Sequence, residues 1–300
     1  MLISVETEVF LSPAHTLVNT VNTAGVMSSG VSAEFKRFFP GAFSHYRSLC
    51  ESGQLQPGRL FFYRADFRDL IHLPIKSHWR TTATAQALES GLQKLADTWA
   101  DYGIHSLAIT QFAEGELEWN SVVKPLLETY LAPLPIPVYL HRSDASDPRR
   151  SVRQIDQFLN LPAADVPIDR LWRDLGRVVR RVYGQFTASD GREVRIAQES
   201  GARFKRMLFT PDGEAPIAIN ESVLSEFWTM VKAAKLLLPA QFPGGLEAVA
   251  PYLLAVLAKT DYVRVVRAAI GDGPYASSLL YIPPPDTATH KLKFFPEASE

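Results

Sequence analysis

The stretch Asn19-Thr20-Val21-Asn22-Thr23-Ala24-Gly25-Val26-Met27-Ser28-Ser29-Gly30 decides the fold class of this 300-residue chain. It follows an apolar run, Leu17-Val18, and precedes a helical pattern at 31–39, which is the order strand, loop, helix. Glycines in such a loop let the backbone approach a phosphate, and the helix N-terminus behind it offers free N–H groups. Asparagine side chains both donate and accept hydrogen bonds, so they can bind ribose hydroxyls. The stretch therefore predicts a site for a nucleotide sugar at the end of a strand.

Composition limits the classes of protein to which the chain can belong. Hydrophobic residues make up 46% of the sequence, enough for a substantial core, and the net charge of −1 gives no global electrostatic case for nucleic acid or membrane binding. The single cysteine, Cys50, excludes an internal disulfide and a cysteine-based zinc site. The first residues lack the basic segment of a signal peptide, and no apolar run is long enough to span a bilayer. We expect a cytoplasmic protein without a metal, a cofactor or membrane contact.

Short apolar strands alternate with helical patterns in the first half of the chain. We expect strands at 2–6, 16–21, 60–64, 70–73, 106–110 and 137–140, and helices at 31–38, 42–52, 84–101 and 119–131. The alternation predicts an α/β fold with a mixed or parallel sheet and helices on its faces.

The composition changes after residue 142. Residues 143–168 are polar and proline-containing, so we expect a linker there, with one short helix near 153–159. Beyond it we expect helices at 169–183, 221–238 and 246–259, and strands at 185–187, 193–198, 263–270 and 277–282. Two helices followed by a hairpin is the order of a winged helix, although many small α+β domains share it. The predicted organisation is an α/β domain at 1–142, a linker at 143–168 and a C-terminal α+β domain at 169–300.

Five stretches in order resemble motifs of the macrodomain family, and within it the branch of the DarG antitoxin and the terminal ADP-ribose protein glycohydrolases. They are Val5-Glu6-Thr7-Glu8-Val9-Phe10, Ser12-Pro13-Ala14-His15-Thr16-Leu17-Val18-Asn19-Thr20-Val21-Asn22, residues 25–40, Leu73-Pro74-Ile75-Lys76-Ser77-His78-Trp79-Arg80 and Leu117-Glu118-Trp119. The resemblance implies a three-layer α/β/α macrodomain with a mixed sheet over the first ~140 residues. It also implies an ADP-ribose cleft at the carboxyl edge of the sheet, and hydrolysis of ADP-ribose from a protein carboxylate or a DNA base.

The same resemblance implies roles for individual residues. Asn22 would hold the distal ribose hydroxyls, Lys76 would be the catalytic lysine, Glu8 would meet the adenine amino group and Val9 would use its backbone beside it. The remaining ligand contacts would come from two loops: Gly25, Val26, Met27, Ser28, Ser29, Gly30 and Val31 in the first, and Ala113 and Gly115 in the second.

The residues by themselves leave some of these roles open. Periodicity alone favours Lys76 as a solvated strand-end lysine or a phosphate contact, whereas a neutral amine between apolar 73–75 and the cationic His78 and Arg80 could act as a nucleophile. Asn19 is the expected turn residue and His78 the expected structural hydrogen-bonder. Trp79 and Trp119 are expected to pack in the core.

The second loop departs from the family pattern. Residues 109–119 keep one glycine where the family has a glycine-rich run, and they carry Glu114 and Glu116 where a diphosphate would lie. An acid in this loop assists the chemistry of the glycohydrolase branch, so we assign that role to Glu116, with Glu114 as the other candidate. The alternative is that the chain has lost ordinary ADP-ribose affinity.

The helix expected at 169–183 carries a cluster of basic side chains: Arg170, Arg173, Arg177, Arg180 and Arg181. Spacings of three and four place most of them on one face, which could follow a phosphate backbone or could simply be a solvated surface.

Three hypotheses for function follow. The leading one is an ADP-ribosyl glycohydrolase that reverses ADP-ribosylation of DNA or protein, in an antitoxin or phage-defence setting. Its C-terminal domain would bind a toxin ADP-ribosyltransferase or DNA. The alternative is a non-catalytic sensor of ADP-ribose or a related nucleotide whose C-terminal domain binds DNA or a protein. The third is an interaction protein with a relic pocket.

Overall fold

The computed structural model describes residues 1–142, 151–201 and 204–286. The chain forms two compact units: Met1–Leu161 with Ala269–Gly273, and Pro162–Ala268 with the described residues from Pro274 onward. The division at Leu161 falls inside the segment for which a linker was predicted.

The first unit is built on a mixed sheet. Its strands lie in the order β1 (Leu2–Val5), β6 (Val138–His141), β5 (Leu107–Thr110), β2 (Thr16–Asn22), β4 (Asp69–Lys76) and β3 (Phe61–Arg64). Neighbours are parallel except for β3, which pairs antiparallel with β4. Residues 69–75 of β4 are all buried, because both faces of a largely parallel sheet are covered. The predicted strands and the mixed sheet are confirmed.

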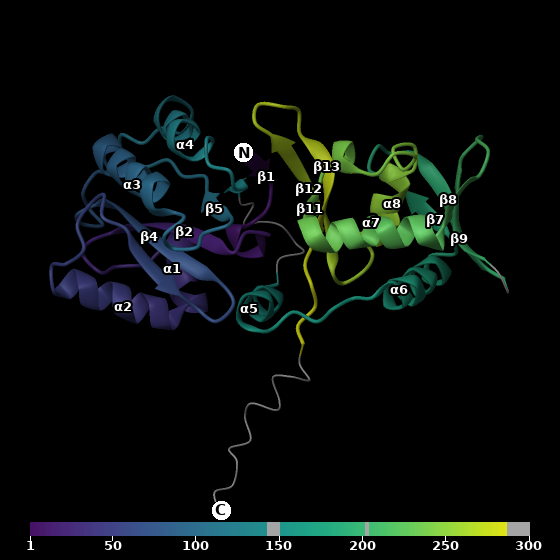
Figure 1. The fold of residues 1–300 in the computed structure, drawn as a ribbon, viewed down its shortest axis with the longest axis horizontal. Helices are drawn as coiled ribbons and strands as arrows, with labels where there is room; N and C mark the ends of the chain where they lie inside the picture. Colours follow the sequence, from purple (N-terminus) through teal and green to yellow (C-terminus); the bar gives the residue numbers. More distant parts are fainter. Residues whose placement is uncertain (143–150, 202–203, 287–300) are drawn as a thin grey trace, which may run out of the picture. The chain divides into compact units, whose positions relative to one another are not determined.

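Helices cover both faces of this sheet (Figure 1). One face carries α1 (Gly30–Phe38) and α2 (Pro40–Glu51), and the other carries α3 (Ala85–Thr98) and α4 (Lys124–Leu131). The apolar stripe of α3, which includes Leu88, Leu92 and Leu95, packs against Ile71 and Leu73 of β4. The predicted three-layer α/β/α arrangement is confirmed.

Short helical turns and strand ends complete the first unit. A 3₁₀ turn, η1 (Val9–Leu11), follows β1, and a π-helical turn, η2 (Trp119–Val123), leads into α4. The Phe10 ring of η1 packs in tilted geometry against the rings of Phe35 and Phe38, at centroid distances of 4.8 and 5.0 Å. This aromatic cluster joins η1 to α1 beneath the sheet.

The helix α5 (Val152–Asn160) also belongs to the first unit, although it lies within the predicted linker. Its Ile155 and Leu159 are buried, and the Asn160 amide donates to the Phe38 carbonyl at 3.3 Å. An amphipathic helix with a buried face is structural rather than connecting. Residues 143–150 of the predicted linker lie outside the described residues.

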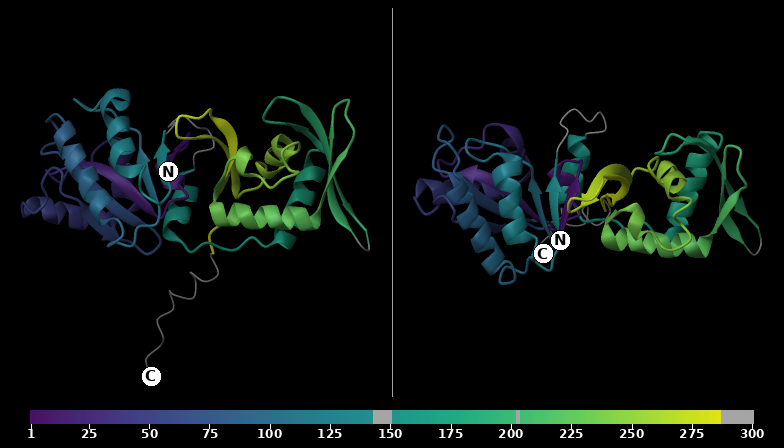
Figure 2. Two further views of the ribbon diagram at one scale, coloured as in Figure 1. Left: turned by 45° about the horizontal axis from the view of Figure 1, so that its top comes forward. Right: turned by 90° about the horizontal axis from the view of Figure 1, so that it is seen from above.

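The second unit is α+β, as predicted. The helices α6 (Ile168–Arg181), α7 (Glu221–Ala234) and α8 (Ala250–Leu257) pack with a four-stranded antiparallel sheet in one core (Figure 2). That sheet has the order β10 (Ile217–Asn220), β9 (Lys205–Pro211), β8 (Glu193–Ser200) and β7 (Gln185–Thr187). The second unit also contains a short turn, η3 (Pro239–Gln241), and three strands outside that sheet, of which β11 (Leu236–Leu237) and β12 (Val263–Ile270, up to Ala268 in this unit) pair with β13 (Ala276–Tyr281). The helix pair and hairpin of the winged-helix order are present as α7, α8, β12 and β13, and winged-helix membership stays a prediction.

Two predicted helices in this unit are shorter than expected. The helix predicted to reach residue 238 ends at Ala234, because Lys235 adopts a φ of 60° and Leu236 and Leu237 then pair with β13. The helix predicted to begin at 246 begins at Ala250, because residues 243–249 form successive turns. Short apolar runs do not distinguish helix from strand, which explains the first error.

Among the described residues, no helix is long and apolar enough to cross a membrane.

Two histidines buried in the sheet make the first unit acid-sensitive. Burial lowers the pKa of His72 in β4 to about 3 and that of His141 in β6 to about 4. In the unfolded chain the pKa of each histidine is near 6.5, so below that pH the unfolded chain binds protons that the folded chain does not. The free energy of unfolding is therefore highest above pH 6.5 and decreases as the pH falls below it. We expect each histidine to reduce the free energy of unfolding by about 2 kcal/mol between pH 7.5 and pH 5. Urea denaturation of the wild type at both pH values measures the loss.

The control variant is His72→Leu, which removes one of the two titrating groups at similar side-chain volume. It should show about half of the wild-type loss. A free energy of unfolding that does not change between the two pH values would contradict the prediction.

Candidate functional site

Two adjoining hollows open at the carboxyl ends of β2, β4 and β5. Their volumes are about 360 and 170 Å³, and both are lined by Thr20, Ser29, Ser32 and Phe112. The larger hollow is also lined by Val21, Asn22, Val26, Met27, Ser28, Ile75, Lys76, Trp79, Ala113 and Glu114, and the smaller by Val18, Asn19, Val31, Ile109, Thr110 and Gln111. Both loops predicted to hold ligand therefore meet at one cleft.

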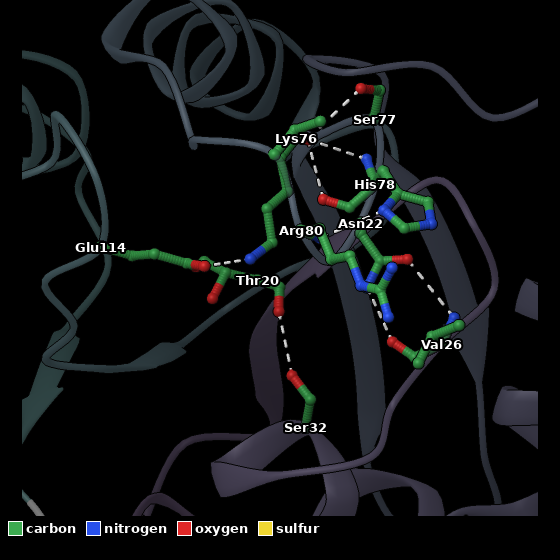
Figure 3. Close-up of polar contacts among 10 residues, drawn as sticks. Thr20, Asn22, Val26, Ser32, Lys76, Ser77, His78, Arg80 and Glu114 are labelled. Carbon is green, nitrogen blue, oxygen red and sulfur yellow. Dashed lines mark hydrogen bonds and ion pairs between the residues drawn. The ribbon is translucent and has the colours of Figure 1, made fainter.

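Asn22 holds the first loop in shape. Its Oδ1 accepts hydrogen bonds from the backbone N–H groups of Ala24 and Val26 at 3.0 and 3.3 Å, and its Nδ2 donates to the Val26 carbonyl at 2.7 Å (Figure 3). The expectation that Asn19 rather than Asn22 forms the turn is wrong, because Asn22 comes last in β2 and only its side chain reaches the loop backbone. Asn19 instead accepts from the Ser32 hydroxyl at 3.1 Å. Asn22 thus lines the cleft and also shapes it.

Two further contacts fix the first loop from behind. The Tyr46 hydroxyl donates to the Asn22 carbonyl at 2.6 Å, and burial, followed by the neighbouring Cys50, raises the pKa of Tyr46. The phenol stays protonated and remains a donor. Gly25 adopts a φ of +74°, a conformation that disfavours a side chain and here allows the loop to bend back over α2.

Lys76 is the last residue of β4 and lines the larger hollow. Its side chain is 11% exposed, and its Nζ forms an ion pair with Oε1 of Glu114 in the second loop (Figure 3). Its backbone carbonyl accepts from Thr23 N at 3.1 Å, which ties the first loop to β4. The pair places a cation and a carboxylate side by side where the two loops meet.

The second loop is a tight turn rather than a glycine-rich cradle. Glu114 and Leu117 exchange backbone hydrogen bonds at 3.1 and 3.0 Å. Gly115 between them has a φ of +62°, and a Cβ there would lie 2.4 Å from Thr82 Cγ2 and 3.2 Å from Ala83 N. The turn can therefore dock on residues 82–83 only with glycine at this position. It carries the Glu114 side chain to Lys76 and leaves Glu116 exposed, outside the lining of both hollows.

Trp79 was expected in the core, and that expectation is wrong. Its side chain is 44% exposed and lines the larger hollow, with the Arg80 guanidinium 4.2 Å from its ring centroid. The sequence signal was its position, three residues after a strand that ends at the ligand edge. His78 makes the expected structural contact, since its Nδ1 accepts from Arg80 N at 3.1 Å, and Trp119 packs against the core.

The predicted ligand residues divide into three groups. Asn22, Val26, Met27, Ser28, Ser29, Val31 and Ala113 line the hollows. Gly25, Gly30 and Gly115 do not line them but set the loop backbone, each with a positive φ. Glu8 and Val9, at the start of η1, are buried and line neither hollow. The Glu8 carbonyl accepts a hydrogen bond from Leu11 N within this turn. Thr20, Ser32 and Phe112 line both hollows and were not predicted.

Replacing Asn22 by alanine should unfold the first loop as well as remove a ligand contact. The substitution leaves the Val26 carbonyl and two N–H groups without their partners, which should cost about 2–3 kcal/mol of folding free energy. Calorimetric titration with ADP-ribose should then show no binding, and urea denaturation should show the loss of stability.

The control is Ser28→Ala, in the same loop, where the exposed hydroxyl has no described hydrogen bond. It should change stability by less than about 0.5 kcal/mol. Equal stability of Asn22→Ala and the wild type would contradict the role of Asn22 in the loop.

Comparison with known proteins agrees with this geometry. Residues 18–123 match the Macro domain family model. A DNA ADP-ribosyl glycohydrolase of Thermus aquaticus is 29% identical over 198 residues, which are 62% of this chain and 55% of that protein. A DNA ADP-ribosyl transferase–DNA ADP-ribosyl glycohydrolase fusion protein of Thermosipho africanus is 32% identical over 158 residues, 46% of this chain and 40% of the relative.

Among solved structures, the macrodomain of Thermus aquaticus DarG is 35% identical, with a TM-score of 0.44, and the match covers 47% of this chain and 97% of that one. The chain spans about half the length, or less, of the curated relatives it matches.

Proposed function

We propose, because the first unit of this chain belongs to the macrodomain family, that it binds ADP-ribose at the cleft and hydrolyses it from a DNA base. The observation that carries the proposal is the Lys76–Glu114 pair in the lining of the larger hollow. The relatives named above are DNA ADP-ribosyl glycohydrolases, which favours DNA over protein as the carrier of the ADP-ribose.

The cleft has the groups that an ADP-ribose diphosphate needs. The helix α1 begins at Gly30, and its N-cap residue, Ser29, makes no side-chain capping bond and lines both hollows. N–H groups at a helix start favour an anionic ligand. An unpaired carboxylate at this place would repel the diphosphate, and the contact of Glu114 with Lys76 neutralises that charge.

The pair also supplies a route to a reactive amine. Lysine is a nucleophile only in its neutral form, and the carboxylate of Glu114 can accept its proton. We infer that the Lys76 lone pair then forms a bond to the anomeric carbon of the distal ribose. The bond from that carbon to the base nitrogen breaks, its electron pair leaves with the base, and the proton held by Glu114 passes to the departing nitrogen. Water then bonds to the anomeric carbon as the bond to the lysine nitrogen breaks, and the proton that the water loses returns the lysine to its ammonium form. The reaction as proposed uses no metal and no cofactor.

The direct test offers two substrates to the wild-type chain. One is an oligodeoxynucleotide that carries ADP-ribose on a base, and the other is a protein that carries ADP-ribose on a glutamate. Chromatography then measures released ADP-ribose. Release from the DNA supports the proposal, release from the protein alone assigns the other substrate, and release from neither, with ADP-ribose binding retained, rejects hydrolysis.

The second candidate function is a non-catalytic sensor of ADP-ribose. The ion pair itself favours it, since an ammonium held by Glu114 can bind a phosphate but cannot attack a carbon. Binding of ADP-ribose without turnover on either substrate would select this function.

The second unit completes the proposal as the part that binds a partner. The fusion of transferase and glycohydrolase in the Thermosipho relative supports a toxin ADP-ribosyltransferase as that partner, with DNA as the other candidate. The protein would then act in the cytoplasm as an antitoxin, and phage defence is a setting in which such a pair could work.

A further inference from the structure

The helix α6 in the second unit presents a cationic face. Arg173, Arg177, Arg180 and Arg181 are exposed, and Arg170 is half-buried. Asp174 pairs with Arg177 and lies 3.8 Å from the Arg170 Nε, so it offsets part of that charge. The other three arginines have no acidic partner among residues 151–201 and 204–286.

Hollows lie on both sides of this face. One, of about 530 Å³, is lined by four cationic side chains, by two acidic ones and by Tyr262; the charged residues are Arg170, Arg177, Arg181, Lys259, Asp174 and Asp261. The other, of about 350 Å³, is lined by Trp172, Arg173, Arg177, Arg180 and Gln198. Arg177 lines both, so the cations form a ridge between two hollows rather than a scattered surface.

An exposed aromatic side chain stands at the end of the ridge. Tyr183 is 87% exposed and has a φ of 53°, where glycine or asparagine is the usual residue after a helix. Gly184 follows at a φ of 73°, and a Cβ there would lie 2.6 Å from the Ile196 carbonyl. The backbone therefore turns sharply here. A tyrosine at this position adds strain and gains no burial, which is typical of a residue retained for a contact outside the fold.

We propose that this face binds a single strand of nucleic acid. Arg173, Arg177 and Arg180 contact successive phosphates, with Arg177 exchanging its ion pair with Asp174 for a phosphate, and a base stacks on the Tyr183 ring. Single strands favour this combination, since arginines follow the backbone while an exposed aromatic ring takes an unpaired base, and a duplex keeps its bases stacked inside. The choice of DNA as the strand rests on the proposed function, in which the substrate of the first unit is ADP-ribosylated DNA. The rest of the inference is independent of that function.

Fluorescence anisotropy with a short, unmodified, single-stranded DNA oligonucleotide tests the proposal on the full chain. We expect the single strand to bind. The logarithm of the association constant should fall linearly with the logarithm of the salt concentration, with a slope of about −2, as three phosphate contacts on a single strand require. The duplex of the same sequence should bind more weakly. Absence of binding to the single strand at low salt, or equal binding to the duplex, would overturn the proposal.

Two variants assign the surface. Tyr183→Gly should weaken binding by about 5- to 100-fold through loss of stacking, whereas Tyr183→Phe should bind as the wild type does. Because glycine relieves the positive φ, the melting temperature of Tyr183→Gly should not fall, so weaker binding would not reflect unfolding. Wild-type affinity of Tyr183→Gly would exclude the stacking contact.

The charge is tested by the double variant Arg173→Gln with Arg180→Gln, which should make the salt slope shallower by about 1.4. The matched control, Arg59→Gln with Lys94→Gln, removes the same charge from exposed positions in the first unit and should keep the wild-type slope. Equal slopes for the two double variants would overturn the assignment. The oligonucleotide carries no ADP-ribose and the assay needs no turnover, so failure of the proposed hydrolysis would leave this result interpretable.

Discussion

Replacing Lys76 by alanine is expected to lower the rate of ADP-ribose release by about a thousandfold or more, and also to weaken ADP-ribose binding, because Glu114 is left without its cation beside the diphosphate. The reason is that the variant removes the group proposed to attack the anomeric carbon, and loss of a nucleophile removes most of the chemical rate enhancement. Single-turnover release from ADP-ribosylated DNA measures the rate, and calorimetric titration with ADP-ribose measures the binding.

A second substitution separates the amine from its charge. Lys76→Arg keeps a cation opposite Glu114, but a guanidinium does not lose its proton in a protein and cannot act as a nucleophile. We expect it to be as inactive as the alanine variant. Substantial activity in Lys76→Arg would mean that Lys76 contributes only positive charge, and the covalent step would have to be abandoned.

Replacing Glu114 by glutamine is expected to reduce the rate about a hundredfold, because the variant can no longer accept the lysine proton. ADP-ribose should bind at least as well as to the wild type, since a carboxylate has been removed from the cleft. Glu116→Gln is the matched control on the same turn: its side chain is exposed and outside both hollows, so its rate should stay within about twofold of the wild type. A larger loss in Glu116→Gln than in Glu114→Gln would return the acid role to Glu116.

The fold of the first unit could be predicted closely because its signals are local and repeated. Periodicity places α3 within a few residues of its observed bounds, and the strand–loop–helix order from β2 to α1 follows from the apolar run and the glycines. The α5 helix was predicted, but its packing against the first unit was not, because burial of Ile155 and Leu159 depends on partners far away in the sequence.

The candidate site was predicted in its components but not in its contacts. Lys76 and the two loops could be located from sequence, whereas the choice between Glu114 and Glu116 depends on which way a four-residue turn points its side chains. That direction is set by Gly115 against Thr82 and Ala83, a contact between distant segments. Trp79 was placed in the core because large aromatic residues are usually buried, and a ligand edge is where that expectation fails.

The attachment of α5 has a practical meaning for dissecting the protein. The sequence alone suggests that the first domain ends at residue 142. A fragment cut there would lack α5, whose Phe158 ring centroid lies 4.6 Å from the Arg68 guanidinium. Arg68 is buried, and the truncation would open it and the Phe10–Phe38 cluster to water. Such an exposed apolar surface promotes aggregation, so a fragment made to study the first domain should keep α5 and extend at least to Leu161.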